Sequence, residues 1–307
     1  MSDRRSDSHR PAVGSDADLV FETAVSDGVC RLARPGTRFL STGFDGGRRV
    51  ADAAYNVTVP EGFDARDLRT YVADRLDRAG FEGPVGPDAA PALLTGVDQT
   101  HARIARRGSV AVLATAGLSN PAALPIDADV VGTEDAAGTG DAAGTGDAAG
   151  TGDAAGTGDA DETAVGEAAV DDRGHAGTVN LVAVTTRSLA DGALANLLTV
   201  VAEAKAATLL ALTGFPGTTS DAVVVADDPD GQPATFSGSA TPVGRATRVC
   251  VRDALAASLR SRYSGGSGDS EGFTDGIPTA VADAEHGVVT DGCAAVRSIP
   301  EADRDPY

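Results

Sequence analysis

Two charged side chains, Glu203 and Lys205, lie in a long segment that is otherwise almost free of charge. From Leu189 to Leu212, the only other charged residue is Asp191, which indicates a helix buried on most sides. At about 100° per residue, Lys205 falls on the leucine and valine stripe, whereas Glu203 points to the opposite side. A carboxylate with a raised pKa can activate water for attack on an amide, and a lysine can serve as its charge partner or as an acid.

Both residues also have an ordinary structural interpretation. An unpaired buried ammonium is costly, so Lys205 must reach solvent, lose its proton or pair with an acid. Such a lysine can simply bond a structural carboxylate near the end of its helix. Glu203 can equally bond a backbone group or an arginine, so the sequence leaves both alternatives open.

The loop GFPGTTSD follows this helix and precedes an apolar strand. Backbone N–H groups beside its glycines, together with the hydroxyls of Thr218 and Thr219, can converge on a carbonyl oxygen, although a capped turn uses the same residue types. Asp221 is a second candidate for the carboxylate that activates water. In a covalent alternative, Thr219 or Ser220 is the nucleophile and Lys205 activates it.

Four further polar residues are candidate substrate ligands. Asn180 is an amide inside the apolar strand GTVNLVAV, where it can orient a substrate carbonyl or brace a neighbouring loop. Ser119 and Asn120 lie in a turn closed by proline, and Asp45 lies in GFDGG, for which a hairpin turn is the plainer interpretation. His101 falls in a helical pattern and is a candidate proton shuttle or a surface residue.

The elements that position these residues alternate between strands and helices. Ser188 with Asp191 resembles a capping box for the helix of Leu189 to Leu212, and Thr241 before proline marks the start of a second helix. This order favours an α+β or mixed α/β fold: a single domain with a mixed β-sheet covered by helices. The expected strands are 19–25, 29–33, 38–42, 53–59, 109–115, 178–185, 222–226 and 234–237, with helices at 64–79, 189–212 and 242–260 and a short strand within 277–296.

The domain is expected to span residues 18–132 and 173–307. Residues 1–17 have the composition of a tail, and SGGSGDSEG after Tyr263 that of a flexible loop. Residues 133–172 contain four tandem copies of DAAGTG, with eleven acidic residues and no basic one. Because alanine is the only apolar residue of the repeat, these copies cannot bury a core, and we expect a disordered acidic insertion.

The composition excludes several classes of function. A net charge of −20 is too negative for general affinity to nucleic acid or anionic lipid. Lys205 is the only lysine among the 25 basic residues, and tryptophan is absent, as is typical of halophilic proteins. Three distant cysteines and the lack of an apolar leader predict a cytoplasmic protein without a membrane span. Phosphate-loop, GxSxG and HExxH motifs are missing, and the histidines lack metal-ligand spacing, so neither metal nor cofactor is expected.

Five segments in order, STGFDGG, TAGLSNP, GTVNLVAV, AEAKAATL and GTTSDAVVV, resemble the adenosylcobinamide amidohydrolase family. The resemblance covers roughly Phe39 to Leu259 apart from the acidic insertion. It implies hydrolysis of the amide between the aminopropanol arm and the corrin ring of adenosylcobinamide, in corrinoid salvage for coenzyme B12 synthesis. The partner is then a small corrinoid; the alternatives are a corrinoid-binding module without turnover and a site for another nucleotide-bearing substrate. The oligomeric state is left open.

Overall fold

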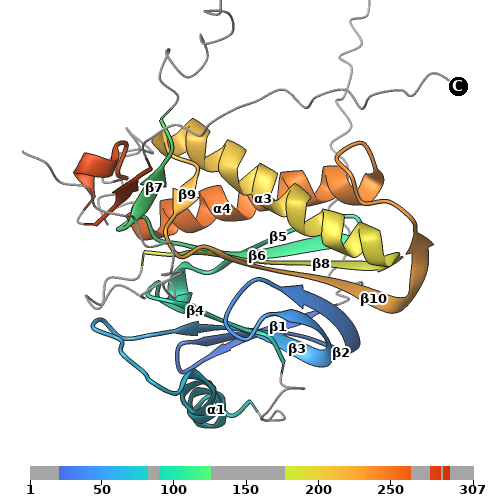
Figure 1. The fold of residues 1–307 in the computed structure, drawn as a ribbon. Helices are drawn as coiled ribbons and strands as arrows, with labels where there is room; N and C mark the ends of the chain where they lie inside the picture. Colours follow the sequence, from blue (N-terminus) through green and yellow to red (C-terminus); the bar gives the residue numbers. More distant parts are fainter. Residues whose placement is uncertain (1–20, 82–89, 126–176, 264–276, 285, 291–307) are drawn as a thin grey trace, which may run out of the picture.

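The computed structural model describes residues 21–81, 90–125, 177–263, 277–284 and 286–290. Over these residues the chain forms a large sheet, a small sheet and three α-helices (Figure 1). The expected tail, the acidic insertion and the loop after Tyr263 lie outside the described residues. The elements are β1 (Glu22–Ser26), β2 (Val29–Ser41), β3 (Gly47–Thr58), α1 (Leu68–Arg78), β4 (Ala92–Thr95), η2 (Gln99–His101), β5 (Arg103–Arg107), β6 (Val110–Ala116), β7 (Pro121–Ala123), β8 (Val179–Leu189), α3 (Asp191–Thr213), β9 (Gly217–Thr218), β10 (Ala222–Ala234), α4 (Pro242–Tyr263), η3 (Val281–Asp283) and β11 (Val288–Val289).

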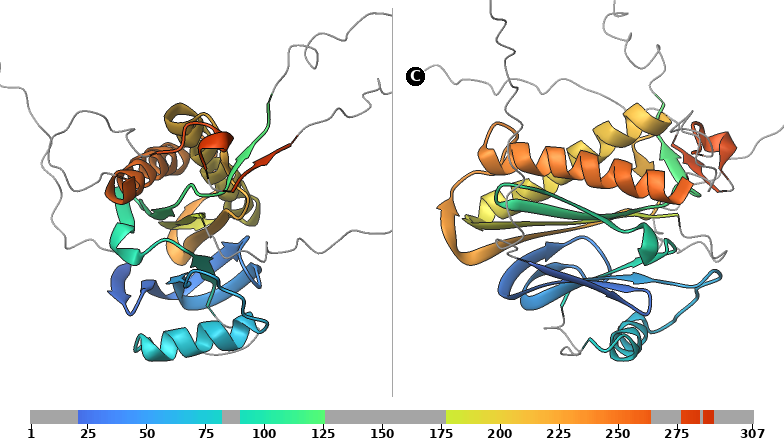
Figure 2. Two further views of the ribbon diagram at one scale, coloured as in Figure 1. Left: turned by 90° about the vertical axis from the view of Figure 1, so that its left-hand side faces the viewer. Right: turned by 180° about the vertical axis from the view of Figure 1, so that it is seen from behind.

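The large sheet is mixed, which confirms the expected fold class. Its strand order is β4-β3-β2-β10-β8-β6-β5, and β1 pairs with β2. The pairs β10–β8 and β3–β4 are parallel, whereas the others are antiparallel. Because β10 pairs with β2 on one side and β8 on the other, it joins two halves of the sheet that lie one above the other (Figures 1 and 2).

Helices cover the outer faces of both halves, so that the molecule is built in four layers (Figure 1). Helices α3 and α4 pack on β6, β8 and β10, with Leu197, Val201 and Leu255 in the core between them. Helix α1 packs on β2, β3 and β4 through Val72 and Ala79. Between the two halves lies an inner core that includes Phe39, Leu93, Val182 and Val224.

Helix α3 is the only helix in the described part of the chain that has the length and apolar composition of a membrane span. In this fold it is a core helix, because nine of its residues are buried against the sheet and α4. Its start differs from the expectation: Ser188 stays in β8, no side chain caps the helix, and Asp191 instead pairs with Arg48. Gly214, in the left-handed conformation at φ 82°, ends the helix.

The start of α4 is as expected, because the Thr241 hydroxyl accepts a hydrogen bond of 3.0 Å from the Gly244 N–H. The GFDGG segment is the hairpin turn between β2 and β3, where Ser41 pairs with Gly47. The strand expected at 222–226 is the first part of a longer strand, β10, whose pairing with β8 shifts in register between Asp227 and Gln232. The strand expected at 234–237 is wrong, because β10 ends at Ala234 and residues 235–237 form no strand.

The segment around His101 is not an α-helix, contrary to the expectation. It is a single 3₁₀ turn, capped by the Asp98 carboxylate, and β5 begins two residues later. The His101 Nδ1 atom lies 3.0 Å from the Ser261 Oγ on α4, so this histidine links the turn to that helix. The apolar positions that suggested a helix belong to the edge strand β5.

The small sheet has the order β11-β7-β9 and lies beside the C-terminal end of α3 (Figure 1). Strands β7 and β11 are parallel, whereas β7 and β9 are antiparallel. The expected short strand near the C-terminus is therefore confirmed as β11. With this pairing, the residues before β7, before β11 and after β9 meet at one edge of the small sheet.

Candidate active site

Hydroxyl and amide side chains gather at this edge. The Asn120 Nδ2 donates to the Thr219 Oγ1 at 2.6 Å and to the Ser220 Oγ at 3.5 Å. The Ser220 Oγ also lies 2.9 Å from the Thr178 Oγ1, which precedes β8. Thr219 and Ser220 are exposed, so their hydroxyls are accessible to a ligand. We call Asn120, Thr178, Thr219 and Ser220 the hydroxyl–amide cluster.

Beneath the cluster, Lys205 and Asp221 form an ion pair with side chains 14% and 10% exposed. One Asp221 oxygen also accepts from the Val179 N–H at 3.0 Å and from the Thr218 hydroxyl. The other, which bonds the lysine, accepts from the Thr218 N–H at 3.1 Å. Two hydrogen bonds at each oxygen hold the carboxylate in one orientation. Lys205 thus bonds a carboxylate that ties the loop to the start of β8.

Gly217 is required next to this pair. A Cβ atom at that position would lie 2.5 Å from the Asp221 Oδ2 and 2.8 Å from the Lys205 Nζ. Both distances are shorter than real contacts allow, so a side chain at this position would force the Asp221 carboxylate and the Lys205 ammonium to shift. The two glycines of GFPG therefore have different roles: Gly214 ends the helix, and Gly217 leaves space for the ion pair.

Glu203 lies elsewhere. Its carboxylate is 55% exposed and stands 3.6 Å from the Arg248 guanidinium on α4. The two charges of α3 thus face different surroundings, as their helical spacing predicts. The structure brings Lys205 to the hydroxyl–amide cluster but does not bring Glu203 there.

Asn180 is almost fully buried and faces the inner core. Its amide donates to the Asn56 Oδ1 at 2.8 Å and to the Leu94 carbonyl at 2.9 Å. Asn56 in turn donates to the Thr115 hydroxyl at 2.9 Å. With both N–H groups of Asn180 taken by protein acceptors, the side chain braces the two halves of the sheet and has no donor left for a substrate carbonyl.

Of the two remaining candidates, one lies at the cluster. The Ser119 carbonyl accepts a hydrogen bond of 2.9 Å from the His286 N–H, and the Ser119 side chain packs against Gly177, next to Thr178. Asp45, at φ 51° in the hairpin turn, instead pairs with Arg69 of α1 at 2.8 Å. It makes no bond to the hydroxyl–amide cluster within the described part of the chain.

His286 is the residue at this edge that the sequence did not single out. It lies two residues before β11, and its backbone bond to Ser119 places it beside Asn120. Histidine is the side chain that most often serves as a general base. The signal that identifies it is topological, because only the parallel pairing of β11 with β7 brings this late segment to the loops before β7 and after β9.

The buried thiols of Cys30 and Cys250 are poor nucleophile candidates. Burial raises the pKa of each thiol to about 11, so both stay protonated at neutral pH. Neither belongs to the cluster. Among the described residues, no group of three or more His, Cys, Asp or Glu side chains is arranged to hold a metal ion.

Comparison with known proteins gives two matches. A family model described as adenosylcobinamide amidohydrolase matches residues 15–266. The chain is also similar to an adenosylcobinamide amidohydrolase of Halobacterium salinarum, with 51% identity over 277 residues. That match covers 90% of this chain and 99% of the relative. The range matched by the family model contains all four residues of the hydroxyl–amide cluster.

Proposed function

The chain belongs to the adenosylcobinamide amidohydrolase family, and from this premise we propose how it hydrolyses its substrate. The reaction is cleavage of the amide between the aminopropanol arm and the corrin ring of adenosylcobinamide. Its products are adenosylcobyric acid and 1-amino-2-propanol, which places the enzyme in cobinamide salvage. The proposal concerns the site: hydrolysis takes place at the hydroxyl–amide cluster.

The observation that carries this proposal is the convergence of hydrogen-bonding side chains above a buried ion pair. Asn120 donates its N–H groups to Thr219 and Ser220 and so holds their exposed hydroxyls, which are the donors available to a substrate. Asp221, next to these residues, is fixed by four hydrogen bonds, from Val179, from Lys205 and twice from Thr218. Donors held in place before the substrate arrives stabilise the oxyanion that develops on an amide carbonyl. Lys205 and Asp221 are positioning residues in this scheme.

Proton transfer falls to His286 in this proposal. A ring nitrogen takes a proton from water as the water oxygen bonds to the carbonyl carbon. When the C–N bond breaks, that proton passes to the leaving nitrogen, which gives a carboxylic acid and an amine; these exchange a proton and leave as a carboxylate and an ammonium. Asp221 is a weaker candidate for this step, because its oxygens already accept four hydrogen bonds.

The covalent alternative keeps the same site but makes Thr219 or Ser220 the nucleophile. The hydroxyl oxygen then attacks the carbonyl carbon, the amine leaves, and water hydrolyses the resulting ester. Rapid quenching and mass spectrometry distinguish the routes: an adduct of the corrinoid acyl group on the 219–220 peptide supports the covalent one. With no adduct during steady turnover, water is the attacking group.

Release of 1-amino-2-propanol from adenosylcobinamide in molar KCl is the direct assay. We expect His286→Gln to lower kcat by about 10² to 10³, within the range for losing a general base. Asn120→Ala should lower kcat by about 10², because the hydroxyl donors that Asn120 holds lose their orientation. Corrinoid binding is measured on the same variants by visible absorption titration. If the protein is a binding module without turnover, the parent protein will bind the corrinoid but release no amine.

Glu203→Gln is the matched control, because it changes a carboxylate on the same helix that lies outside the cluster. We expect its kcat to stay within about twofold of the parent, as for other exposed surface changes. Loss of activity in Glu203→Gln together with full activity in His286→Gln would transfer the role of base to Glu203 and contradict the proposed site.

A further inference from the structure

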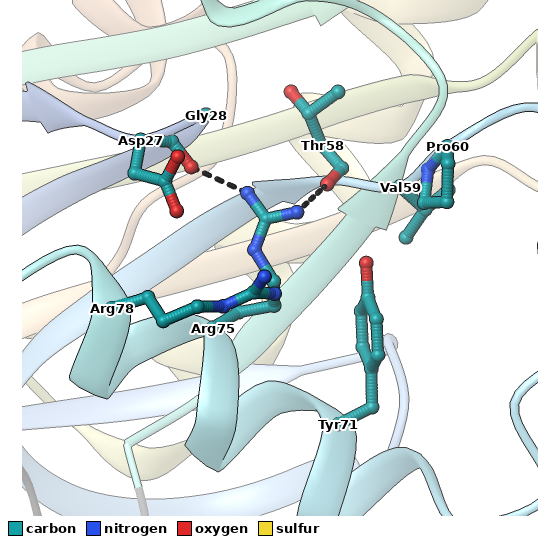
Figure 3. A pocket seen from close by; sticks show the side chains of 8 residues that line it. All are labelled: Asp27, Gly28, Thr58, Val59, Pro60, Tyr71, Arg75 and Arg78. Carbon is teal, nitrogen blue, oxygen red and sulfur yellow. Dashed lines mark hydrogen bonds between the residues drawn. The ribbon is translucent and has the colours of Figure 1, made fainter.

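A groove on the opposite side of the molecule, next to α1, has no part in the proposed reaction. It lies between the β1–β2 turn, the end of β3 and α1, and it has a volume of about 400 Å³. The two sheet halves separate it from α3, which carries Lys205 (Figure 1). Its lining residues are Asp27, Gly28, Thr58, Val59, Pro60, Tyr71, Arg75 and Arg78 (Figure 3).

Two buried donors in this groove make no hydrogen bond with the described residues: the Tyr71 hydroxyl and the Arg75 Nε. Tyr71 rises from α1 with its hydroxyl towards the space beside the Arg75 guanidinium (Figure 3). Buried polar atoms are almost always paired, because an unpaired one has lost its hydrogen bonds to water without replacing them. Two such donors at one groove indicate that an acceptor from outside the chain binds between them.

The charge at the groove is positive, in contrast to the rest of this acidic chain. The other Arg75 nitrogens donate to the carbonyls of Asp27 and Thr58, which carry no formal charge to balance the guanidinium. Arg78, one turn further along α1, is exposed, and no carboxylate in the described part of the chain lies within 4.0 Å of it. An occupant that accepts hydrogen bonds and carries negative charge therefore fits.

We propose that this groove binds the phosphate group of a small phosphate monoester. Arg78 and the Arg75 Nε supply charged donors and Tyr71 supplies an O–H, and three donors on separate side chains suit the several oxygens of a phosphate. The volume exceeds that of phosphate alone, and Val59, Pro60 and the Tyr71 ring form an apolar wall for the organic part. The site is separate from amide hydrolysis.

Asp27 lines the same groove and gives the proposal a distinctive test. Its carboxylate repels an anion bound there, while its backbone carbonyl holds Arg75 in place. Asp27→Asn removes the negative charge and keeps the carbonyl. Phosphate binding should therefore become tighter in Asp27→Asn, by about threefold to tenfold, whereas a purely structural arginine would give no such gain.

The experiment is isothermal titration calorimetry of the full chain with phenyl phosphate, inorganic phosphate and benzoate at constant ionic strength in KCl. We expect saturable binding that is tightest for phenyl phosphate, weaker for inorganic phosphate and weakest for benzoate. Arg78→Ala and Tyr71→Phe should weaken phenyl phosphate binding by about tenfold or more, in line with losing one hydrogen bond to a charged group. Arg106→Ala, an exposed arginine on β5, is the matched charge control and should bind as the parent does.

Three outcomes would overturn the proposal. One is the absence of saturable phenyl phosphate binding in the parent; another is equal binding by the parent, Arg78→Ala and Tyr71→Phe. The third is a loss of affinity as large in Arg106→Ala as in Arg78→Ala, which would show a general charge effect. Amide hydrolysis is not the readout, so these outcomes are independent of the proposed active site.

Discussion

Replacing Lys205 by methionine tests whether the largely buried ion pair with Asp221 holds the loop of the hydroxyl–amide cluster. Methionine keeps the apolar stem that crosses the core but removes the ammonium, so the Asp221 carboxylate loses its only cationic partner among the described residues. Breaking a buried pair from one side typically costs about 3–5 kcal/mol. Asp221 retains three hydrogen bonds, from Val179 and Thr218, so the lower end, about 3 kcal/mol, is the expected loss.

The assay is unfolding by urea, an uncharged denaturant, monitored by circular dichroism at several KCl concentrations. Arg48→Met is the control, because it breaks an exposed pair with Asp191 whose side chains are 45% and 75% exposed. That change should cost less than about 0.5 kcal/mol. Since the Debye length is only about 3 Å in molar salt, the exposed pair should contribute nothing there, while the Lys205 effect should persist.

A double-mutant cycle then isolates the pair itself. Asp221→Asn in the Lys205→Met background removes the carboxylate that lost its cationic partner. The double variant should therefore lose less free energy of unfolding than the sum of the losses in the two single variants. A coupling energy of at least about 1 kcal/mol is expected for residues in contact. If the free energy of unfolding of Lys205→Met lies within about 0.5 kcal/mol of that of the parent, and the coupling energy is zero, the ion pair does not hold this loop.

Three further outcomes follow from the caps and the thiols. Thr241→Ala should lower the free energy of unfolding by about 1 kcal/mol in urea unfolding, and Thr241→Ser should restore it, because the hydroxyl caps α4. In a Cys293→Ser background, dithionitrobenzoate at pH 8 should label Cys30 and Cys250 only after unfolding; rapid labelling of the native chain would contradict their burial. Because the unfolded chain loses the thiol protons at lower pH than the folded chain, the free energy of unfolding should fall as the pH rises from 9.0 to about 11. Replacing Cys30 by alanine should make this fall with pH less steep.

Hydrophobic pattern predicted the long elements, because each buries one continuous face. The apolar stripe with Leu197 and Val201 predicts α3, and the continuous apolar run around Leu113 predicts β6, which is buried on both faces. Strand β4 escaped prediction because its four residues are too few to show a period. Strand β5 escaped because three of its five residues are arginines on the edge of the sheet.

For the site, residue type and spacing predicted that Lys205 and Glu203 face opposite sides and that the loop of Thr218 to Asp221 immediately precedes a buried strand. They could not predict the partner of Lys205, because Asp221 is one of 45 acidic residues in the chain. His286 could not be found at all from its neighbours, since its place depends on the pairing of two-residue β11 with β7. Contacts between segments so far apart along the chain leave no periodic trace.

The small sheet β11-β7-β9 also bears on how the protein is made. During synthesis both sheet halves and α4 are complete when Tyr263 has been added, yet His286 and β11 have still to leave the ribosome. Domains begin to fold as soon as their residues are available, and contacts across long sequence separations form late. The residues of both sheet halves are therefore available to fold before the site is complete, and a later segment, with His286 and β11, completes the edge at which Asn120 and Ser220 meet.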